Sequence, residues 1–104
     1  MQVVKDYDLV KIVTKSSNLK ILLAIKSGKK RWSNFEKILN KKQVSDALKE
    51  LIELGLVKPV KHVRGLKEYN IYELTDTGRQ VLEYLEKAEL ILKNSVKEEV
   101  EVVD

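Results

Sequence analysis

The segment from Asn40 to Gly55 holds side chains suited to one kind of chemistry, hydrogen bonding to nucleic acid. A glutamine amide can donate and accept in one plane, which matches an adenine edge, and lysine can reach guanine or phosphate, while aspartate can accept from cytosine. The free N–H groups at a helix start also favour phosphate. The alternative for Lys49, Glu50 and Glu53 is a solvated face with helical charge pairs. The candidate contact residues are Lys41, Lys42, Gln43, Asp46 and Lys49.

A second set of basic residues, Lys61, Arg64 and Lys67, surrounds the expected tip of a hairpin together with His62. A projecting arginine suits the negative potential of a narrow DNA groove, so we expect Arg64 to touch DNA. The alternative is that charged tips keep hairpins soluble and block pairing between sheet edges.

A third set lies before the expected third helix. Lys30 and Arg31 are suited to phosphate contacts that position a protein on DNA without reading its sequence. Ser33 could offer its hydroxyl to phosphate, although capping the third helix is an equally good role for it. Trp32 is expected in the core or an interface.

Helices must position these groups, and apolar spacing predicts them. The first covers about residues 3–14. The second contains Leu19, Leu22, Leu23 and Ile25 and ends near Gly28, with Ser16-Ser17-Asn18 as break and cap. Residues 29–32 form an extended link or a strand of one bridge. Ser33 and Glu36 complete a capping box for a short third helix. Asn40 caps a fourth helix over about residues 41–54, which Gly55 terminates.

The second half of the chain predicts a hairpin and a long helix. Strands over Leu56–Arg64 and Lys67–Leu74 flank a two-residue turn at Gly65-Leu66. Thr75 caps the last helix, which Asn94-Ser95 ends. Because its apolar residues recur at the spacing of a short coiled coil, we expect dimerisation there. The expected interface residues are Tyr7, Val10, Val81, Leu85, Ala88 and Leu92.

Composition limits the classes of function. The 104 residues suit a single domain, and the absence of Cys excludes disulfides and thiolate metal sites. The only His has no convincing set of partner ligands, and no catalytic constellation or phosphate-binding glycine loop stands out. No apolar run approaches the length of a membrane span, and no signal-peptide pattern begins the chain. We therefore expect a cytoplasmic protein that is not an enzyme and uses no cofactor or metal.

The charge is unevenly distributed. Residues 1–67 hold 16 Lys and Arg against 6 Asp and Glu, a net charge of +10, whereas residues 68–104 hold 4 against 10, a net charge of −6. The basic part coincides with the candidate contact residues, as expected for a surface that binds phosphate. A lysine-rich solvated surface is the alternative.

The stretch from Gly28 to Leu85 resembles the winged helix-turn-helix of MarR- and HxlR-type transcriptional regulators. The matching pieces are GKKRWSNF, VSDALKELIELGLV and YELTDTGRQVL. The resemblance implies a fourth helix in the major groove and a wing along the adjacent minor groove. The segment between Phe35 and Val44 is shorter than usual, which predicts an abbreviated third helix.

These observations predict a mainly α fold with a small β-hairpin (α+β), a winged helix-turn-helix with a terminal dimerisation helix. Its parts are a DNA-binding domain over 1–75, the dimerisation helix over 76–94 and an acidic tail over 95–104, which frays or adds a strand. The expected function is sequence-specific binding of double-stranded DNA by a homodimeric transcriptional regulator. The main alternative is a protein-interaction module within a transcription or replication assembly. A small-molecule effector is left open.

Overall fold

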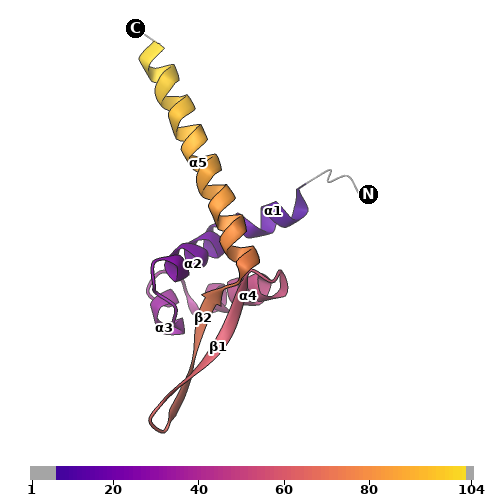
Figure 1. Cartoon of the computed structure of the whole chain (residues 1–104), viewed down its shortest axis with the longest axis vertical. Helices are drawn as coiled ribbons and strands as arrows, with labels where there is room; N and C mark the ends of the chain where they lie inside the picture. Colours follow the sequence, from indigo (N-terminus) through magenta and orange to yellow (C-terminus); the bar gives the residue numbers. More distant parts are fainter. Residues whose placement is uncertain (1–6, 103–104) are drawn as a thin grey trace.

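The computed structural model describes residues 7–102 and, in detail, the side chains of residues 7–96. Helices α1 (Asp8–Val13), α2 (Ser16–Lys26), α3 (Trp32–Phe35) and α4 (Lys41–Glu53) precede strands β1 (Val57–Arg64) and β2 (Lys67–Leu74), and helix α5 (Asp76–Val102) follows. In Figure 1 the hairpin and α5 extend in opposite directions from a body made of the shorter helices. The predicted α+β class and winged helix-turn-helix order are confirmed.

The chain breaks between α1 and α2 earlier than the sequence predicts. Residues 3–6 of the expected first helix lie outside the described part, and α1 begins at Asp8. The prediction that Ser16-Ser17-Asn18 forms a break and cap is wrong, because these residues are the first turn of α2. The break lies at Thr14 and Lys15, where the Thr14 hydroxyl donates to the carbonyl of Val10 at 2.7 Å.

The helix-turn-helix consists of α3, a tight turn and α4. The third helix is short, as predicted, with four residues. The prediction that Ser33 and Glu36 cap it is wrong: Ser33 lies inside the helix, and the side chain of Asn34 accepts from the backbone N–H of Arg31 at 3.0 Å. Asn40 caps α4 as predicted, since its side chain accepts from the N–H of Gln43 at 2.8 Å.

The hairpin, which we call the wing, pairs β1 with β2 from Val57↔Leu74 to Arg64↔Lys67. The two-residue turn at Gly65-Leu66 is confirmed, and the positive φ of Gly65, 66°, is a backbone conformation that glycine adopts easily. Arg31 adds one antiparallel bridge to Ile71 at the edge of β2, so the expected single-bridge strand is present. The N–H of Tyr72 donates to the carbonyl of Lys30 at 2.8 Å and fixes this edge.

One apolar core joins the helices to the base of the wing and the start of α5. Phe35, Ile21, Leu22 and Leu51 are its largest fully buried side chains, and Leu82 brings α5 into it. Trp32 packs against this core, as expected. Each of these residues would expose apolar surface to water if its element separated from the others, so burial holds the elements together.

The end of the last helix differs from the prediction. Asn94-Ser95 does not end α5, which continues to Val102, and the segment predicted to fray or form a strand is helical as far as that residue. The predicted cap is confirmed, because Thr75 Oγ1 accepts from the N–H of Gly78 at 3.0 Å. Within residues 7–102, no helix combines the length and apolar composition needed to cross a membrane.

Candidate DNA interface

The start of α4 is exposed and tightly capped. Gln43 and Asn40 form a reciprocal capping box: the Gln43 N–H donates to Asn40 Oδ1 at 2.8 Å, and Gln43 Oε1 accepts from the Asn40 N–H at 3.0 Å. The Gln43 amide oxygen is therefore engaged in the cap, while its NH₂ group makes none of the hydrogen bonds found in the described residues. This geometry leaves Gln43 with two donors to offer a ligand.

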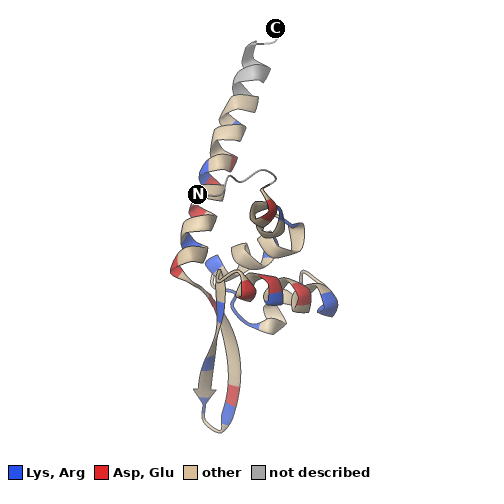
Figure 2. Ribbon diagram, turned by 90° about the vertical axis from the view of Figure 1, so that its right-hand side faces the viewer, with Lys and Arg blue, Asp and Glu red and all other residues tan. Residues whose placement is uncertain are grey.

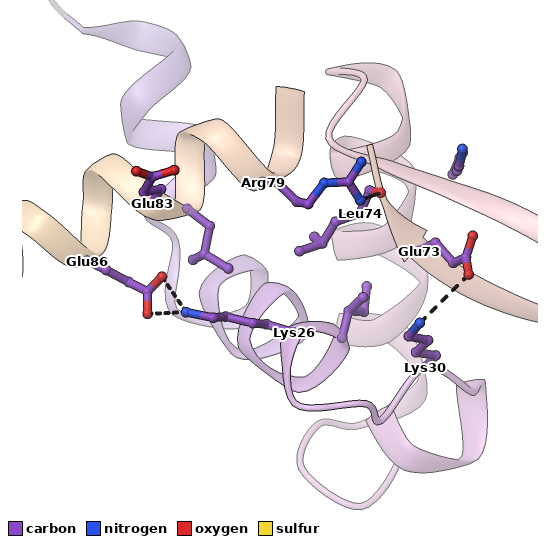
Figure 3. A pocket seen from close by; sticks show the side chains of 10 residues that line it. Lys26, Lys30, Glu73, Leu74, Arg79, Glu83 and Glu86 are labelled. Carbon is purple, nitrogen blue, oxygen red and sulfur yellow. Dashed lines mark hydrogen bonds and ion pairs between the residues drawn. The ribbon is translucent and has the colours of Figure 1, made fainter. Parts of the chain in front are cut away.

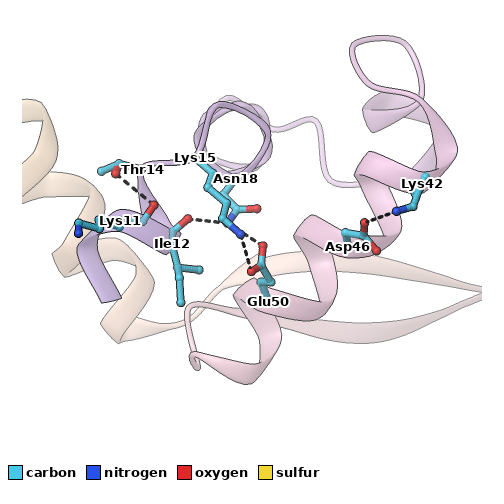
Figure 4. Close-up of polar contacts among 8 residues, drawn as sticks. All are labelled: Lys11, Ile12, Thr14, Lys15, Asn18, Lys42, Asp46 and Glu50. Atoms are coloured by element: carbon cyan, nitrogen blue, oxygen red, sulfur yellow. Dashed lines mark hydrogen bonds and ion pairs between the residues drawn. The ribbon is translucent and has the colours of Figure 1, made fainter. Parts of the chain in front are cut away.

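The other predicted residues of α4 also lie on its solvent side. Lys42 and Asp46 form an ion pair one turn apart, with Nζ and Oδ2 separated by 3.5 Å (Figure 4). Their side chains are 85% and 64% exposed, so the pair lies in water and contributes only about 0–1 kcal/mol. Lys41 and Lys49 are exposed as well. Breaking this ion pair therefore costs little free energy, so Lys42 and Asp46 can each bind a ligand instead.

A polar cluster behind α4 connects it to the α1–α2 junction (Figure 4). Lys15 Nζ lies 2.9 Å from Glu50 Oε2, and the amide nitrogen of Asn18 lies 3.4 Å from Glu50 Oε1. The hydrogen bond from Lys15 lowers the pKa of the Glu50 carboxyl, partial desolvation opposes this, and the Asn18 amide and the charge of Lys15 lower it further. Sequence patterns give no signal for this cluster, because Glu50 lies 35 residues from Lys15 and 32 residues from Asn18 along the chain.

The segment before α3 pairs with β2 and places Arg31 against the wing. Its guanidinium carbon lies 4.2 Å from the centre of the Tyr69 ring, a cation–π geometry, and the Tyr69 ring is 5.8 Å from that of His62. Lys30 Nζ lies 3.7 Å from Glu73 Oε1, so part of its charge is neutralised locally. Tyr69 was not predicted as a site residue, since only the folded arrangement brings it to Arg31.

Basic residues surround the wing tip, where Figure 2 shows Lys and Arg positions on both strands. Arg64 and Lys67 stand directly opposite each other across the last rung of the ladder, whereas Lys61 stands opposite Asn70. All three side chains are exposed. The structure therefore brings together two of the predicted wing residues and places the third on another rung.

A groove of about 660 Å³ lies where α5 meets α2 and the base of the wing (Figure 3). Ile25, Leu74 and Leu82 line it together with four basic and three acidic side chains. Across it, Lys26 Nζ binds both carboxylate oxygens of Glu86. Arg79 donates to the carbonyl of Leu74 at 3.0 Å. These contacts attach α5 to the body by its polar side chains as well as by the core.

The predicted dimer residues fall into two groups. Tyr7, Val10, Ala88 and Leu92 are exposed, whereas Val81 and Leu85 are partly buried against the chain's own core. Additional exposed apolar residues continue the same side of α5, as expected from about 100° of rotation per residue. We define the α5 apolar face as the residues Tyr84, Ala88, Ile91, Leu92 and Val96.

Among the described residues, no group of His, Asp and Glu side chains is arranged to hold a metal ion. Around α4 and the wing, the exposed side chains include cationic and amide donors, which suit anionic and hydrogen-bonding partners.

Solved structures share the fold. YodB from B. subtilis, in a diamide-treated form, superposes with a TM-score of 0.75 at 20% identity over 90% of this chain and 95% of its own. The protein ytcD, assigned as an HTH-type transcriptional regulator, gives a TM-score of 0.73 at 19% identity, covering 91% and 99%. A protein of Porphyromonas gingivalis W83 assigned to the MarR family gives 0.65 at 20%, covering 90% and 99%.

Among curated proteins, none matches the chain. The HxlR-like helix-turn-helix family matches residues 12–99, which include every described element except the start of α1 and the end of α5. The chain therefore belongs to the HxlR-like helix-turn-helix family and is a transcription regulator of that class.

Proposed function

We propose that the protein binds specific sequences in double-stranded DNA and regulates transcription as a homodimer. The observation that carries this proposal is the exposed, capped start of α4, where Lys41, Lys42 and Gln43 present cationic and amide donors. A helix start of this composition suits the donor and acceptor pattern of base edges in a major groove. Family membership supports the same function, because helix-turn-helix proteins of this class are transcription regulators.

The wing and the edge before α3 supply the phosphate contacts in this proposal. Arg64 and Lys67 flank the wing tip. In this proposal they reach the groove next to the one that α4 enters. Lys30 and Arg31 lie along the edge of β2, and Ser33 follows in α3. In this proposal all three bind the phosphate backbone of DNA, which positions α4 without reading sequence.

The apolar surface that one chain leaves uncovered supports the proposed homodimer. The α5 apolar face and exposed residues of α1, including Tyr7 and Val10, would be removed from water by a second copy. A two-fold dimer places two α4 helices in successive major grooves about one helical turn apart. The DNA site is then a palindrome or near-palindrome.

Selection from a pool of random duplexes, followed by sequencing of the bound molecules, tests the proposal. We expect a motif with two inverted halves and an affinity that falls steeply as salt rises, because cationic contacts release counterions. A motif without symmetry contradicts the homodimeric mode, and weak binding without any motif contradicts sequence-specific recognition.

Two variants of Gln43 separate its role in the cap from its role in recognition. Gln43→Glu keeps an acceptor for the Asn40 N–H but removes the amide donors, whereas Gln43→Ala removes both. We expect Gln43→Glu to retain stability and to lose preference at one base position per half-site, a loss of roughly 1–3 kcal/mol. If the selected motif is unchanged in Gln43→Glu, this side chain does not read a base.

A second candidate function is a protein-interaction module. The observation in its favour is a groove of about 490 Å³ between α2 and α3, where exposed Leu23 and Ile38 lie among Lys20, Lys29 and Lys37. Absence of duplex binding at low salt would favour this function over the first.

A further inference from the structure

The register of the wing divides its side chains into two faces. Residues opposite each other on an antiparallel ladder point to the same side, and successive residues alternate. The rungs His62↔Tyr69 and Arg64↔Lys67 therefore share one face, which we call the cationic wing face together with Arg31. The rungs Lys61↔Asn70 and Val63↔Glu68 share the opposite face.

The two faces differ in charge. The cationic wing face carries Arg64, Lys67 and Arg31 beyond the base of the hairpin, with no carboxylate among them. The opposite face carries Lys61 and Glu68, whose formal charges cancel. Phosphates along a DNA strand are attracted by the first face and gain no net attraction from the second.

The last rung is unfavourable for the isolated wing. Like charges directly opposite each other destabilise an antiparallel pair, and Arg64 stands opposite Lys67. Neither is among the ion pairs of the described side chains. An anion between these two cations would turn the repulsion into attraction, so the rung is better suited to a phosphate ligand than to hairpin stability.

Arg31 reaches the cationic wing face from another element. Its bridge to Ile71 places it at the edge of β2, and its guanidinium lies over the Tyr69 ring at 4.2 Å. A guanidinium held over a ring by the cation–π attraction has five N–H donors, and those that do not face the ring can still donate to a ligand. Tyr69 thereby limits the rotamers of Arg31 and lowers the entropy that a phosphate contact costs.

We propose that the wing contacts DNA phosphates through the cationic wing face alone, and that Tyr69 is a positioning residue that holds Arg31 for this contact. Lys61, on the opposite face, makes no contact with DNA. This inference rests on the proposed DNA binding and adds to it which side of the wing is used.

Lys67→Ala and Lys61→Ala are a matched pair that tests the choice of face. Each variant removes one exposed lysine from the same hairpin, and neither side chain is packed in the core. Lys67 lies directly beside the turn, and three residues separate Lys61 from it. Binding to a duplex of the selected sequence is measured by fluorescence anisotropy over a range of salt. We expect Lys67→Ala to reduce the slope of log affinity against log salt by about one unit per half-site and Lys61→Ala to leave it unchanged.

A double-mutant cycle tests the role of Tyr69. We expect Tyr69→Leu to weaken binding severalfold in the wild-type background and to have no effect in the Arg31→Ala background, because the ring acts through Arg31. Tyr69→Phe keeps the ring and is expected to bind like the wild type. Equal weakening by Tyr69→Leu in both backgrounds would show that the ring acts by another route and would overturn this part of the inference.

The outcomes distinguish this inference from the function on which it rests. If the wild-type protein does not bind duplex DNA, the proposed function itself is wrong. If the wild type binds and the salt dependence of binding falls equally in the two lysine variants, DNA binding stands and the choice of face is wrong.

Thermal unfolding of each variant establishes that it is folded. If Tyr69→Leu does not fold, Tyr69→Phe and Arg31→Lys replace the double-mutant cycle. In that case we expect Arg31→Lys to bind more weakly and Tyr69→Phe to bind normally, and equal binding of both to the wild type would reject the stack.

Discussion

The side-chain amide of Asn18 holds together α1, α2 and α4. Its nitrogen donates to the carbonyl of Ile12 at 2.7 Å and lies 3.4 Å from the carboxylate of Glu50. Asn18 is only 1% exposed, and its oxygen is buried without a hydrogen-bond partner among the described residues. A buried amide of this kind holds the end of α1 and the middle of α4 in a single arrangement.

Replacing Asn18 by leucine is expected to destabilise the protein by about 1–3 kcal/mol, because the carbonyl of Ile12 loses its donor while leucine keeps the same branched shape with bulkier ends. Urea unfolding measures the change. Thr14→Ala, at an exposed hydroxyl of the same junction, is the comparison and should cost less, since water can replace its bond to Val10. A leucine variant as stable as the wild type would show that the amide adds nothing to the junction.

The ion pair of Lys15 with Glu50 predicts a dependence of stability on pH. The pKa of Glu50 is lower in the folded protein than in the unfolded chain, chiefly because of the Lys15 hydrogen bond. Its contribution to stability is therefore present above the unfolded-state pKa and is lost as the pH falls through the folded-state pKa. Lys15→Met should raise the pKa of Glu50 towards its ordinary value.

Carboxyl NMR titration of Glu50 measures this shift, and urea unfolding at neutral and acidic pH measures its consequence. We expect the wild type to be more stable than Lys15→Met at neutral pH and the difference to disappear in acid. A difference that persists below the folded-state pKa would assign the effect to packing of the lysine stem instead.

Gly78 in the first turn of α5 is predicted to be intolerant of any side chain. A Cβ at this position would overlap the carbonyl oxygen of Leu56, which belongs to the backbone and cannot rotate away. Glycine to alanine within a helix usually stabilises by about 0.5–1 kcal/mol, but here overpacking should destabilise by roughly 1–3 kcal/mol. Thermal unfolding of Gly78→Ala beside Thr77→Ala, an exposed neighbour expected to change stability by less than about 0.5 kcal/mol, checks this prediction.

The dimer interface can be tested with two leucines of α5 that have nearly equal exposure, Leu92 at 62% and Leu90 at 59%. At about 100° per residue they point to nearly opposite sides of the helix, and only Leu92 belongs to the α5 apolar face. We expect Leu92→Lys to sediment as a monomer and Leu90→Lys to remain a dimer. Two variants with the same sedimentation behaviour would place the interface elsewhere. Leu85 is unsuitable for this test, because it packs against the chain's own core.

Elements with strong local signals could be predicted from the sequence. Asn40 and Thr75 are residues that prefer helix N-caps, and Gly65 supplies the positive φ of a two-residue turn, so each acts through neighbours within about three residues. Helical periodicity is a local signal of the same kind, since it alone separates the exposed lysines of α4 from the buried Val44 and Leu51.

The incorrect predictions concern competition between nearby groups or contacts across the fold. Ser33 is a residue type common at N-caps, but the side chain that accepts from the Arg31 N–H is that of Asn34. The helix therefore begins at Trp32, two residues earlier than a Ser33 cap predicts. Asn18 resembles a cap residue in sequence, yet the packing of α1 on α2 buries it. The stack of Arg31 on Tyr69 depends on a bridge between segments 40 residues apart in sequence, which no local pattern encodes.

Only Thr75 separates the end of β2 at Leu74 from the start of α5 at Asp76. That residue is held on both sides, since its hydroxyl donates to the carbonyl of Gly55 and its N–H donates to that of Leu56 at 3.0 Å. The wing and the long helix are thus joined without a loop between them, and these bonds fix the residue that links them. In the proposed dimer, the distance between the two DNA half-sites is consequently set by the fixed connection of the wing to α5 rather than by a flexible linker. Adding a single base pair between the halves would rotate one of them by roughly a tenth of a turn. A dimer with this fixed geometry could not adjust to that rotation.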